Sequence, residues 1–176
     1  RNSKYLKKII VATTTKKTDD KIVNFCKKNK ISYFRGDENN VLKRYYLAAR
    51  KFKVKKIIRI TSDCPLIDYR ILDQMIRVFK RKRVDYYANS LPLPCKYPDG
   101  MDIEIFTFKT LKQTFKKALL PSEKEHVTNY MWKKNNFKIL KKNINNNLSK
   151  YRFTIDYKKD FVFFCKIIDR FGTNTI

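Results

Sequence analysis

Two acidic residues stand just after short apolar segments that predict β-strands. Asp63 lies two residues after the segment 56–61, and Asp156 directly follows the segment 152–155. Ligands of open α/β sheets collect beyond the carboxyl ends of strands, and Mg²⁺ takes one or two carboxylates beside water and phosphate oxygens. We therefore predict that Asp63 and Asp156 together bind one Mg²⁺ ion against phosphate. The alternatives are an Asx-turn at Asp63 and a helix N-cap at Asp156.

A second group of acids lies in the segment 98–104, where Asp99, Asp102 and Glu104 fall within six residues. Side chains two residues apart on a strand point to the same side, so Asp102 and Glu104 are placed to bind a sugar hydroxyl or a second metal ion. The alternative is a solvated strand edge. The sequence holds a single histidine, His126, and a lone histidine is more often structural than catalytic.

The chain is strongly basic, with 42 Lys and Arg residues against 16 Asp and Glu residues and a formal net charge of +26. Nucleic-acid binders gather such charge on one face or in one stripe. Here the lysines are spread through every segment, so we interpret them as solvated surface charge and disfavour a nucleic-acid partner.

Several classes of protein do not fit the sequence. No apolar run approaches the roughly 20 residues of a membrane-spanning helix, so we expect no membrane insertion. No signal peptide is visible. The four cysteines form no CxxC pair, which favours free thiols in the cytoplasm. Only three glycines occur, so neither a Walker A loop nor a GxGxxG fingerprint is present.

The hydrophobic pattern predicts an α/β protein. Apolar β-branched runs alternate with segments of helical periodicity, which favours a mostly parallel sheet with helices on both faces. We expect Asn39 or Asn40 and Asp68 to cap two of the helices, and residues 18–20 to cap the first. The predicted strands are 8–13, 31–34, 56–61, 85–89, 103–108, 137–140 and 152–155, and the predicted helices are 20–28, 40–49, 68–79, 110–119, 125–134 and 158–170.

Six stretches of the chain resemble, in order, the cytidylyltransferase-like family of the spore coat polysaccharide biosynthesis protein F type. That family is related to the acylneuraminate and deoxy-octulosonate cytidylyltransferases. The matching stretches are Ile10-Val-Ala-Thr-Thr-Thr15 with Asp19-Asp20, Phe34-Arg-Gly-Asp-Glu-Asn-Asn-Val-Leu42, Arg59-Ile-Thr-Ser-Asp-Cys-Pro-Leu-Ile-Asp68, Tyr97-Pro-Asp-Gly-Met-Asp-Ile-Glu104, Glu125-His-Val-Thr128 and Arg152-Phe-Thr-Ile-Asp156.

The resemblance implies a Rossmann-like nucleotidyltransferase fold of the glycosyltransferase A type. The implied reaction is transfer of a nucleotidyl group from CTP, or from another nucleoside triphosphate, to a sugar or sugar acid destined for surface polysaccharide or glycan. The expected cofactor is Mg²⁺, and related enzymes are often homodimers. The residues expected to act are catalytic Asp63, Asp156, Arg59 and Arg152, with the two aspartates as metal ligands, and Asp99, Asp102, Glu104 and His126 on the acceptor side.

The chain departs from the family at its beginning. The family opens with a strand and a loop of the type Gln-Ala-Arg-Met-Gly-Ser-Thr-Arg-Leu-Pro-Gly-Lys, which holds the base and the triphosphate, and this sequence has neither. We therefore expect residues 1–176 to be a single nucleotidyltransferase domain without its first strand and loop. The alternative functions are a non-catalytic or fused sugar-biosynthesis subunit, a glycosyltransferase-like protein or, less favoured, a basic nucleic-acid-binding module.

Overall fold

A computed structural model describes residues 2–172 of the chain. These residues form two compact units. Unit 1 comprises the described parts of the segments Arg1–Tyr5, Ile58–Ile105 and Lys138–Ile176, and unit 2 comprises Leu6–Ile57 and Phe106–Phe137. The prediction that the chain is one domain stays a prediction.

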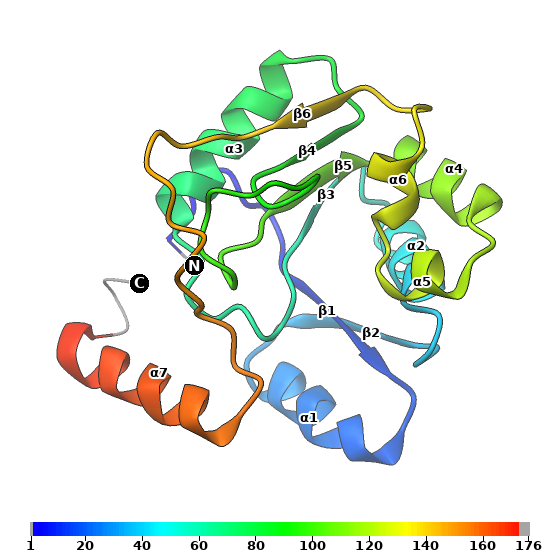
Figure 1. The fold of residues 1–176 in the computed structure, drawn as a ribbon. Helices are drawn as coiled ribbons and strands as arrows, with labels where there is room; N and C mark the ends of the chain where they lie inside the picture. The colour runs from blue at the N-terminus through cyan, green and yellow to red at the C-terminus, as the bar shows by residue number, and fades with distance from the viewer. Residues whose placement is uncertain (1, 173–176) are drawn as a thin grey trace. The chain divides into compact units, whose positions relative to one another are not determined.

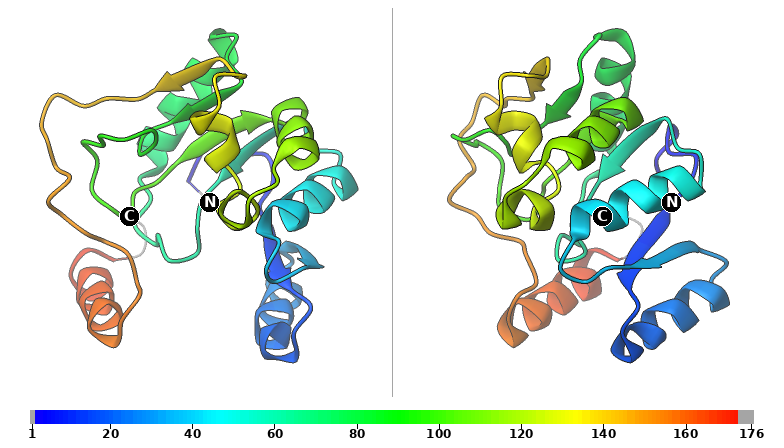
Figure 2. Two further views of the ribbon diagram at one scale, coloured as in Figure 1. Left: turned by 45° about the vertical axis from the view of Figure 1, so that its right-hand side comes forward. Right: turned by 90° about the vertical axis from the view of Figure 1, so that its right-hand side faces the viewer.

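Unit 2 contains a two-stranded parallel sheet made of β1 (Ile10–Thr14) and β2 (Ser32–Gly36). The helices α1 (Asp20–Lys28) and α2 (Val41–Lys51) lie on opposite faces of this sheet (Figure 2). Apolar side chains at helical spacing cover the sheet, because Val23 and Cys26 of α1 and Leu42 of α2 are buried. This strand–helix–strand–helix segment agrees with the predicted alternation.

The turn between β1 and α1 is held by Asp19, although not in the way predicted. Asp19 is the N-cap residue of α1, within the predicted residues 18–20, but its side chain makes no cap hydrogen bond. Its carboxylate instead accepts hydrogen bonds from the Thr13 hydroxyl (2.6 Å), the Thr14 hydroxyl (2.7 Å) and the Thr14 amide (2.9 Å). These three hydrogen bonds lower the pKa of Asp19 to about 2, and the bond from the Thr13 hydroxyl has the largest effect.

Three helices complete unit 2: α4 (Phe108–Lys117), α5 (Pro121–Glu125) and α6 (Asn129–Lys133). The predicted helix over 125–134 is confirmed for α6, but its predicted start is wrong, because α5 ends at Glu125 and α6 starts only at Asn129. Val127 between them has φ 56°, which a right-handed helix does not allow. The helix α2 packs against α4 and α5.

The second sheet has four strands in the order β3-β5-β4-β6. The four strands lie side by side in this order in Figure 1. The strands are β3 (Lys56–Arg59), β4 (Tyr86–Ala88), β5 (Glu104–Thr107) and β6 (Ile139–Lys141), and β4 pairs with β6 in parallel. The strands thus fall into two sheets where one was expected. The predicted strand over 152–155 is wrong, since Arg152 forms only an isolated bridge with Asp99.

The core of unit 1 lies between this sheet and α3 (Tyr69–Arg81). As predicted, Asp68 caps α3, because its side chain accepts a hydrogen bond from the Arg70 amide at 2.7 Å. One face of α3 is apolar and packs against β4, β5 and Ile103, which directly precedes β5. The buried residues of this cluster are Leu72, Met75, Ile76, Phe79, Tyr87, Ile103 and Ile105.

After β6 the chain runs through residues 142–157 without a helix or named strand and then forms α7 (Lys158–Phe171) (Figure 1). None of the side chains of α7 is buried. Among residues 2–172 no helix is both long and apolar enough to cross a membrane.

Candidate active site

The three acidic segments singled out in the sequence lie side by side in unit 1. The Asp63 carbonyl accepts a hydrogen bond from the Ile155 amide at 2.9 Å. The Asp99 amide donates to the Tyr151 carbonyl at 3.0 Å, and the Phe153 amide donates to the Asp99 carbonyl at 2.7 Å. Backbone hydrogen bonds therefore join the Asp63 loop to segment 151–156, and segment 151–156 to the loop that carries Asp99 and Asp102.

Gly100 allows this close approach. Its φ is +89°, a region that residues with a side chain rarely adopt. A Cβ atom added at this position would lie 2.6 Å from the carbonyl carbon of Phe153 and from the amide nitrogen of Thr154. Any other residue would push the two segments apart.

Asp63 lies in the loop between β3 and α3, four residues after β3 ends at Arg59. The predicted position beyond the end of a strand is confirmed. The Asp63 residue is half-buried, and the Cys64 thiol donates to its Oδ1 at 3.6 Å. Burial raises the pKa of the Cys64 thiol to about 11, with smaller contributions from the carboxylates of Asp63 and Asp102.

Arg152 gathers the acids of the C-terminal segment. Its guanidinium donates to the Asp156 carboxylate and, at 3.0 and 3.1 Å, to both carboxylate oxygens of Asp160, and it lies 4.0 Å from Asp99. The hydrogen bonds with Asp160 and Asp156 raise the pKa of Arg152, and those from Arg152 and Tyr157 lower the pKa of Asp160.

The N-cap alternative for Asp156 is wrong. The N-cap of α7 is Tyr157, and the Asp160 carboxylate accepts from the backbone amides of Asp156 (3.0 Å) and Tyr157 (2.8 Å). Asp156 therefore lies outside the helix. The Thr154 hydroxyl donates to its Oδ2 at 2.9 Å, the same oxygen that Arg152 contacts.

Glu104 is buried, so its interpretation as a solvated strand edge is wrong. Only 1% of the residue is exposed. Its carboxylate accepts hydrogen bonds from the Arg59 guanidinium and, at 2.6 Å, from the Tyr86 hydroxyl. The Arg59 guanidinium thus forms an ion pair with Glu104. A buried carboxylate needs such partners, and removing one would leave an uncompensated charge.

Asp102 is half-buried in the loop just before β5, close to this ion pair. Burial raises its pKa to about 6, and the charges of Asp99 and Glu104 add to the effect. A hydrogen bond with Ser90 and the charge of Arg59 act in the opposite direction. Burial and the neighbouring negative charges thus disfavour the ionised form of Asp102 more than Ser90 and Arg59 stabilise it.

Sequence reasoning missed the residues that hold Asp102, above all Asn89. This side chain is fully buried. Its amide nitrogen donates to the Met101 carbonyl at 2.7 Å and its amide oxygen accepts from the Ile103 amide at 2.7 Å. The only sequence signal was a polar residue directly after the apolar strand 86–88, which is too common to single out.

His126 is the one predicted site residue outside unit 1. It is exposed and follows the short helix α5 in unit 2. The acids that the backbone hydrogen bonds bring together belong to unit 1 alone, so the predicted role of His126 on the acceptor side stays a prediction.

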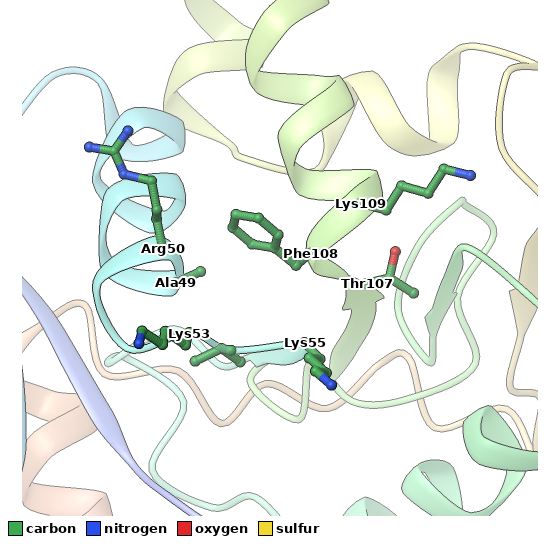
Figure 3. Close-up of a pocket in the computed structure, with 8 residues that line it drawn as sticks. Ala49, Arg50, Lys53, Lys55, Thr107, Phe108 and Lys109 are labelled. Carbon is green, nitrogen blue, oxygen red and sulfur yellow. The ribbon is translucent and has the colours of Figure 1, made fainter.

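Unit 2 also has a surface cavity of about 440 Å³ at the end of α2 and the start of α4 (Figure 3). It contains none of the predicted site residues. Its lining contains four cationic side chains, three apolar side chains and one hydroxyl group. The lining residues are Ala49, Arg50, Lys53, Val54, Lys55, Thr107, Phe108 and Lys109.

The chemistry of the acids fits the predicted magnesium ion. Among residues 2–172 no group of three or more His, Cys, Asp or Glu side chains is arranged to hold a metal ion. Mg²⁺ does not need such a cage, because it is usually bound by one or two carboxylates and keeps several water molecules. Asp63 and Asp156 supply carboxylate oxygens from two segments that are hydrogen-bonded at Ile155.

The fold is that of a nucleotidyltransferase. The chain is similar to the solved structure of a cytidylyltransferase from Leptospira borgpetersenii, with a TM-score of 0.92 and 35% sequence identity over 99% of this chain and 74% of that one. A 4-diphosphocytidyl-2C-methyl-D-erythritol synthase from Anaerococcus prevotii shares the fold at a TM-score of 0.55 and 12% identity, covering 96% and 82% of the two chains. These similarities confirm the predicted fold class.

The chain belongs to the cytidylyltransferase family, whose model, described as "Cytidylyltransferase", matches residues 1–171. It is 34% identical over 174 residues to the uncharacterized protein MJ1063 of Methanocaldococcus jannaschii, covering 97% of this chain and 70% of that protein. It is 32% identical over 160 residues to the spore coat polysaccharide biosynthesis protein SpsF of Bacillus subtilis, covering 87% of this chain and 63% of SpsF. The predicted resemblance is confirmed.

Proposed function

We propose that this protein transfers a cytidylyl group from CTP to a hydroxyl of a sugar or sugar acid, and that the activated sugar is used to build a surface polysaccharide or glycan. Membership of the cytidylyltransferase family supports the choice of CTP, and the similarity to SpsF supports the sugar acceptor. The observation that carries the proposal is the convergence of three acidic segments through the backbone hydrogen bonds of Asp63, Asp99 and Ile155.

In this proposal Asp63 and Asp156 hold Mg²⁺, which neutralises charge on the phosphates when it is bound. Within residues 2–172 no donor is hydrogen-bonded to Oδ1 of Asp156, whereas its Oδ2 accepts from both Arg152 and Thr154. The arginine and the threonine hydroxyl thus fix the Asp156 carboxylate through one oxygen. The second oxygen remains as a ligand.

Asp99 and Asp102 would accept hydrogen bonds from the hydroxyl groups of the acceptor. Arg152 lies 4.0 Å from Asp99 but donates its hydrogen bonds to Asp156 and Asp160, and Arg59 is paired with Glu104. A hydroxyl that donates to a carboxylate makes a charge-assisted hydrogen bond, which is stronger than a bond between neutral groups. We place the reaction in the cytoplasm, which the four free cysteines support.

The test is pyrophosphate release by the protein expressed from its full reading frame. CTP, UTP, ATP and GTP are each offered with Mg²⁺ and a panel of neutral sugars, sugar phosphates and sugar acids. We expect release that needs an acceptor, is fastest with CTP and stops when EDTA removes the metal. A protein that releases no pyrophosphate with any pair would refute the proposal, and a preference for another nucleotide would refute the choice of CTP.

A further inference from the structure

The Asn89 side chain bridges the two peptide groups that flank Asp102. Its Nδ2 donates to the carbonyl of Met101, which belongs to the peptide before Asp102, and its Oδ1 accepts from the amide of Ile103, which belongs to the peptide after it. Both distances are 2.7 Å, and the Asn89 residue has no exposed surface. The backbone on both sides of Asp102 is therefore fixed by one side chain.

The hydrogen bonds of the Asn89 side chain replace backbone pairing at the point where β4 ends. Asn89 directly follows β4, and its own amide still donates to the Ile103 carbonyl, at a longer distance of 3.3 Å. Beyond that point Met101 and Asp102 no longer pair with β4 as a strand would. The side-chain amide supplies the donor and the acceptor that the missing ladder would have supplied.

Asparagine is the residue type that this position requires. A carboxylate of the same shape accepts but cannot donate, and an alkyl side chain does neither. Asn89 thus holds the backbone on both sides of Asp102.

We propose that Asn89 is a positioning residue that fixes the Asp102 carboxylate for binding the acceptor sugar. The inference rests on the proposed function, in which Asp102 binds the acceptor. Side chains that support a binding group through hydrogen bonds keep it within the narrow range of geometry that the reaction needs. Asn89 does not itself contact the acceptor in this proposal.

The test compares Asn89→Ala and Asn89→Asp with the wild-type protein from its full reading frame, in the pyrophosphate-release assay. We expect kcat/KM for the acceptor to fall by on the order of 10²-fold, as for other misplaced groups. The KM for CTP should not change. The matched control is Phe79→Leu, which disturbs the core of unit 1 but leaves both hydrogen bonds of the Asn89 side chain in place, and it should change melting temperature but not kcat/KM for the acceptor.

A double variant separates positioning from general stability. If Asn89 acts through Asp102, adding Asn89→Ala to Asp102→Asn should reduce kcat/KM by less than about threefold further, because the two sites are coupled. Effects that multiply would overturn the proposal. So would a loss of activity in Asn89→Ala that Phe79→Leu reproduces at the same loss of melting temperature.

Carboxyl ¹³C NMR on the 176-residue chain keeps this test independent of the proposed function. In Asn89→Ala the pKa of Asp102 should move toward its ordinary value, while in Phe79→Leu it should stay raised. If the wild-type protein releases no pyrophosphate, the proposed function fails and the NMR result still decides on Asn89. An unchanged pKa of Asp102 in Asn89→Ala would show that Asn89 does not hold this carboxylate.

Discussion

The raised pKa of Asp102 makes the stability of the protein depend on pH. Burial raises its pKa from 3.8 to about 6, so between these pH values the folded protein binds more protons at this site than the unfolded chain does. Stability therefore falls as pH rises through this window. We predict that Asp102→Asn gains stability over the wild-type protein as pH increases from 3.8 to about 6, and that the gain is absent below this range.

Urea midpoints measured across this pH range check the prediction, because a shift in the midpoint at constant slope reports stability. Asp169→Asn, which removes an exposed acid on α7, is the matched control. A difference between Asp102→Asn and the wild-type protein that does not vary with pH would show that Asp102 has an ordinary pKa.

The identity of the acidic residues was predictable from the sequence, but their environments were not. Asp63 and Asp156 stood out because they follow apolar runs, and the structure places them in two hydrogen-bonded segments. Glu104 was misjudged, because no local pattern reveals that Arg59 and Tyr86 meet it inside the protein. Asn89 was missed for the same reason, since its partners lie 12 and 14 residues away.

At the scale of elements, the contact between segments 98–100 and 151–154 depends on Gly100. We predict that Gly100→Ala destabilises the protein by about 1–3 kcal/mol from backbone strain alone, with the steric clash adding to this. The added Cβ would lie 2.6 Å from backbone atoms of Phe153 and Thr154, which cannot rotate away. Because the same contact aligns Asp99 with Arg152, pyrophosphate release should fall as well.

Gly36→Ala is the matched control for this change. Its Cβ would meet the side chains of Phe34 at 3.0 Å and Arg44 at 3.1 Å, and its φ is not in the left-handed region. Side chains can shift, so we expect a smaller loss of stability in a urea titration. Equal losses in the two variants would contradict a special role of Gly100.

Elements defined by local signals were predicted well, and those that depend on distant partners were not. Asn40 and Asp68 cap α2 and α3 through hydrogen bonds to the amides of Lys43 and Arg70, which lie two or three residues away. The segment 152–155 has the composition of a strand but forms only the bridge between Asp99 and Arg152. The division of the strands into two sheets likewise had no local signal.

At the scale of the whole molecule, the net charge of +26 predicts weak and unselective binding of polyanions. We expect binding to labelled single- and double-stranded nucleic acids that does not depend on sequence and weakens steeply with salt, because counterion release drives it. Fluorescence anisotropy at low and physiological salt measures this. Nanomolar affinity for one defined sequence at physiological salt would revive the nucleic-acid hypothesis.

The family's opening loop leads to a further prediction for the molecule as a whole. We expect the 176-residue chain to release pyrophosphate far more slowly than a form that also carries such a loop. A triphosphate needs aimed donors, and losing even one preorganised donor typically costs about 10²–10³-fold in rate. Equal rates in the two forms would show that the loop is dispensable. The predicted homodimer is checked in the same samples by light scattering.

The central claim is that Asp63 and Asp156 act together at one metal site for cytidylyl transfer. The most direct measurement is Mg²⁺-dependent pyrophosphate release from CTP by the protein from its full reading frame, compared with Asp63→Asn, Asp156→Asn and the exposed control Asp169→Asn. We predict that each of the first two variants loses on the order of 10²-fold or more in turnover, as for other preorganised charges, with little change in melting temperature, while the control keeps full activity. Unchanged turnover in Asp63→Asn and Asp156→Asn would contradict the claim and place the metal site elsewhere.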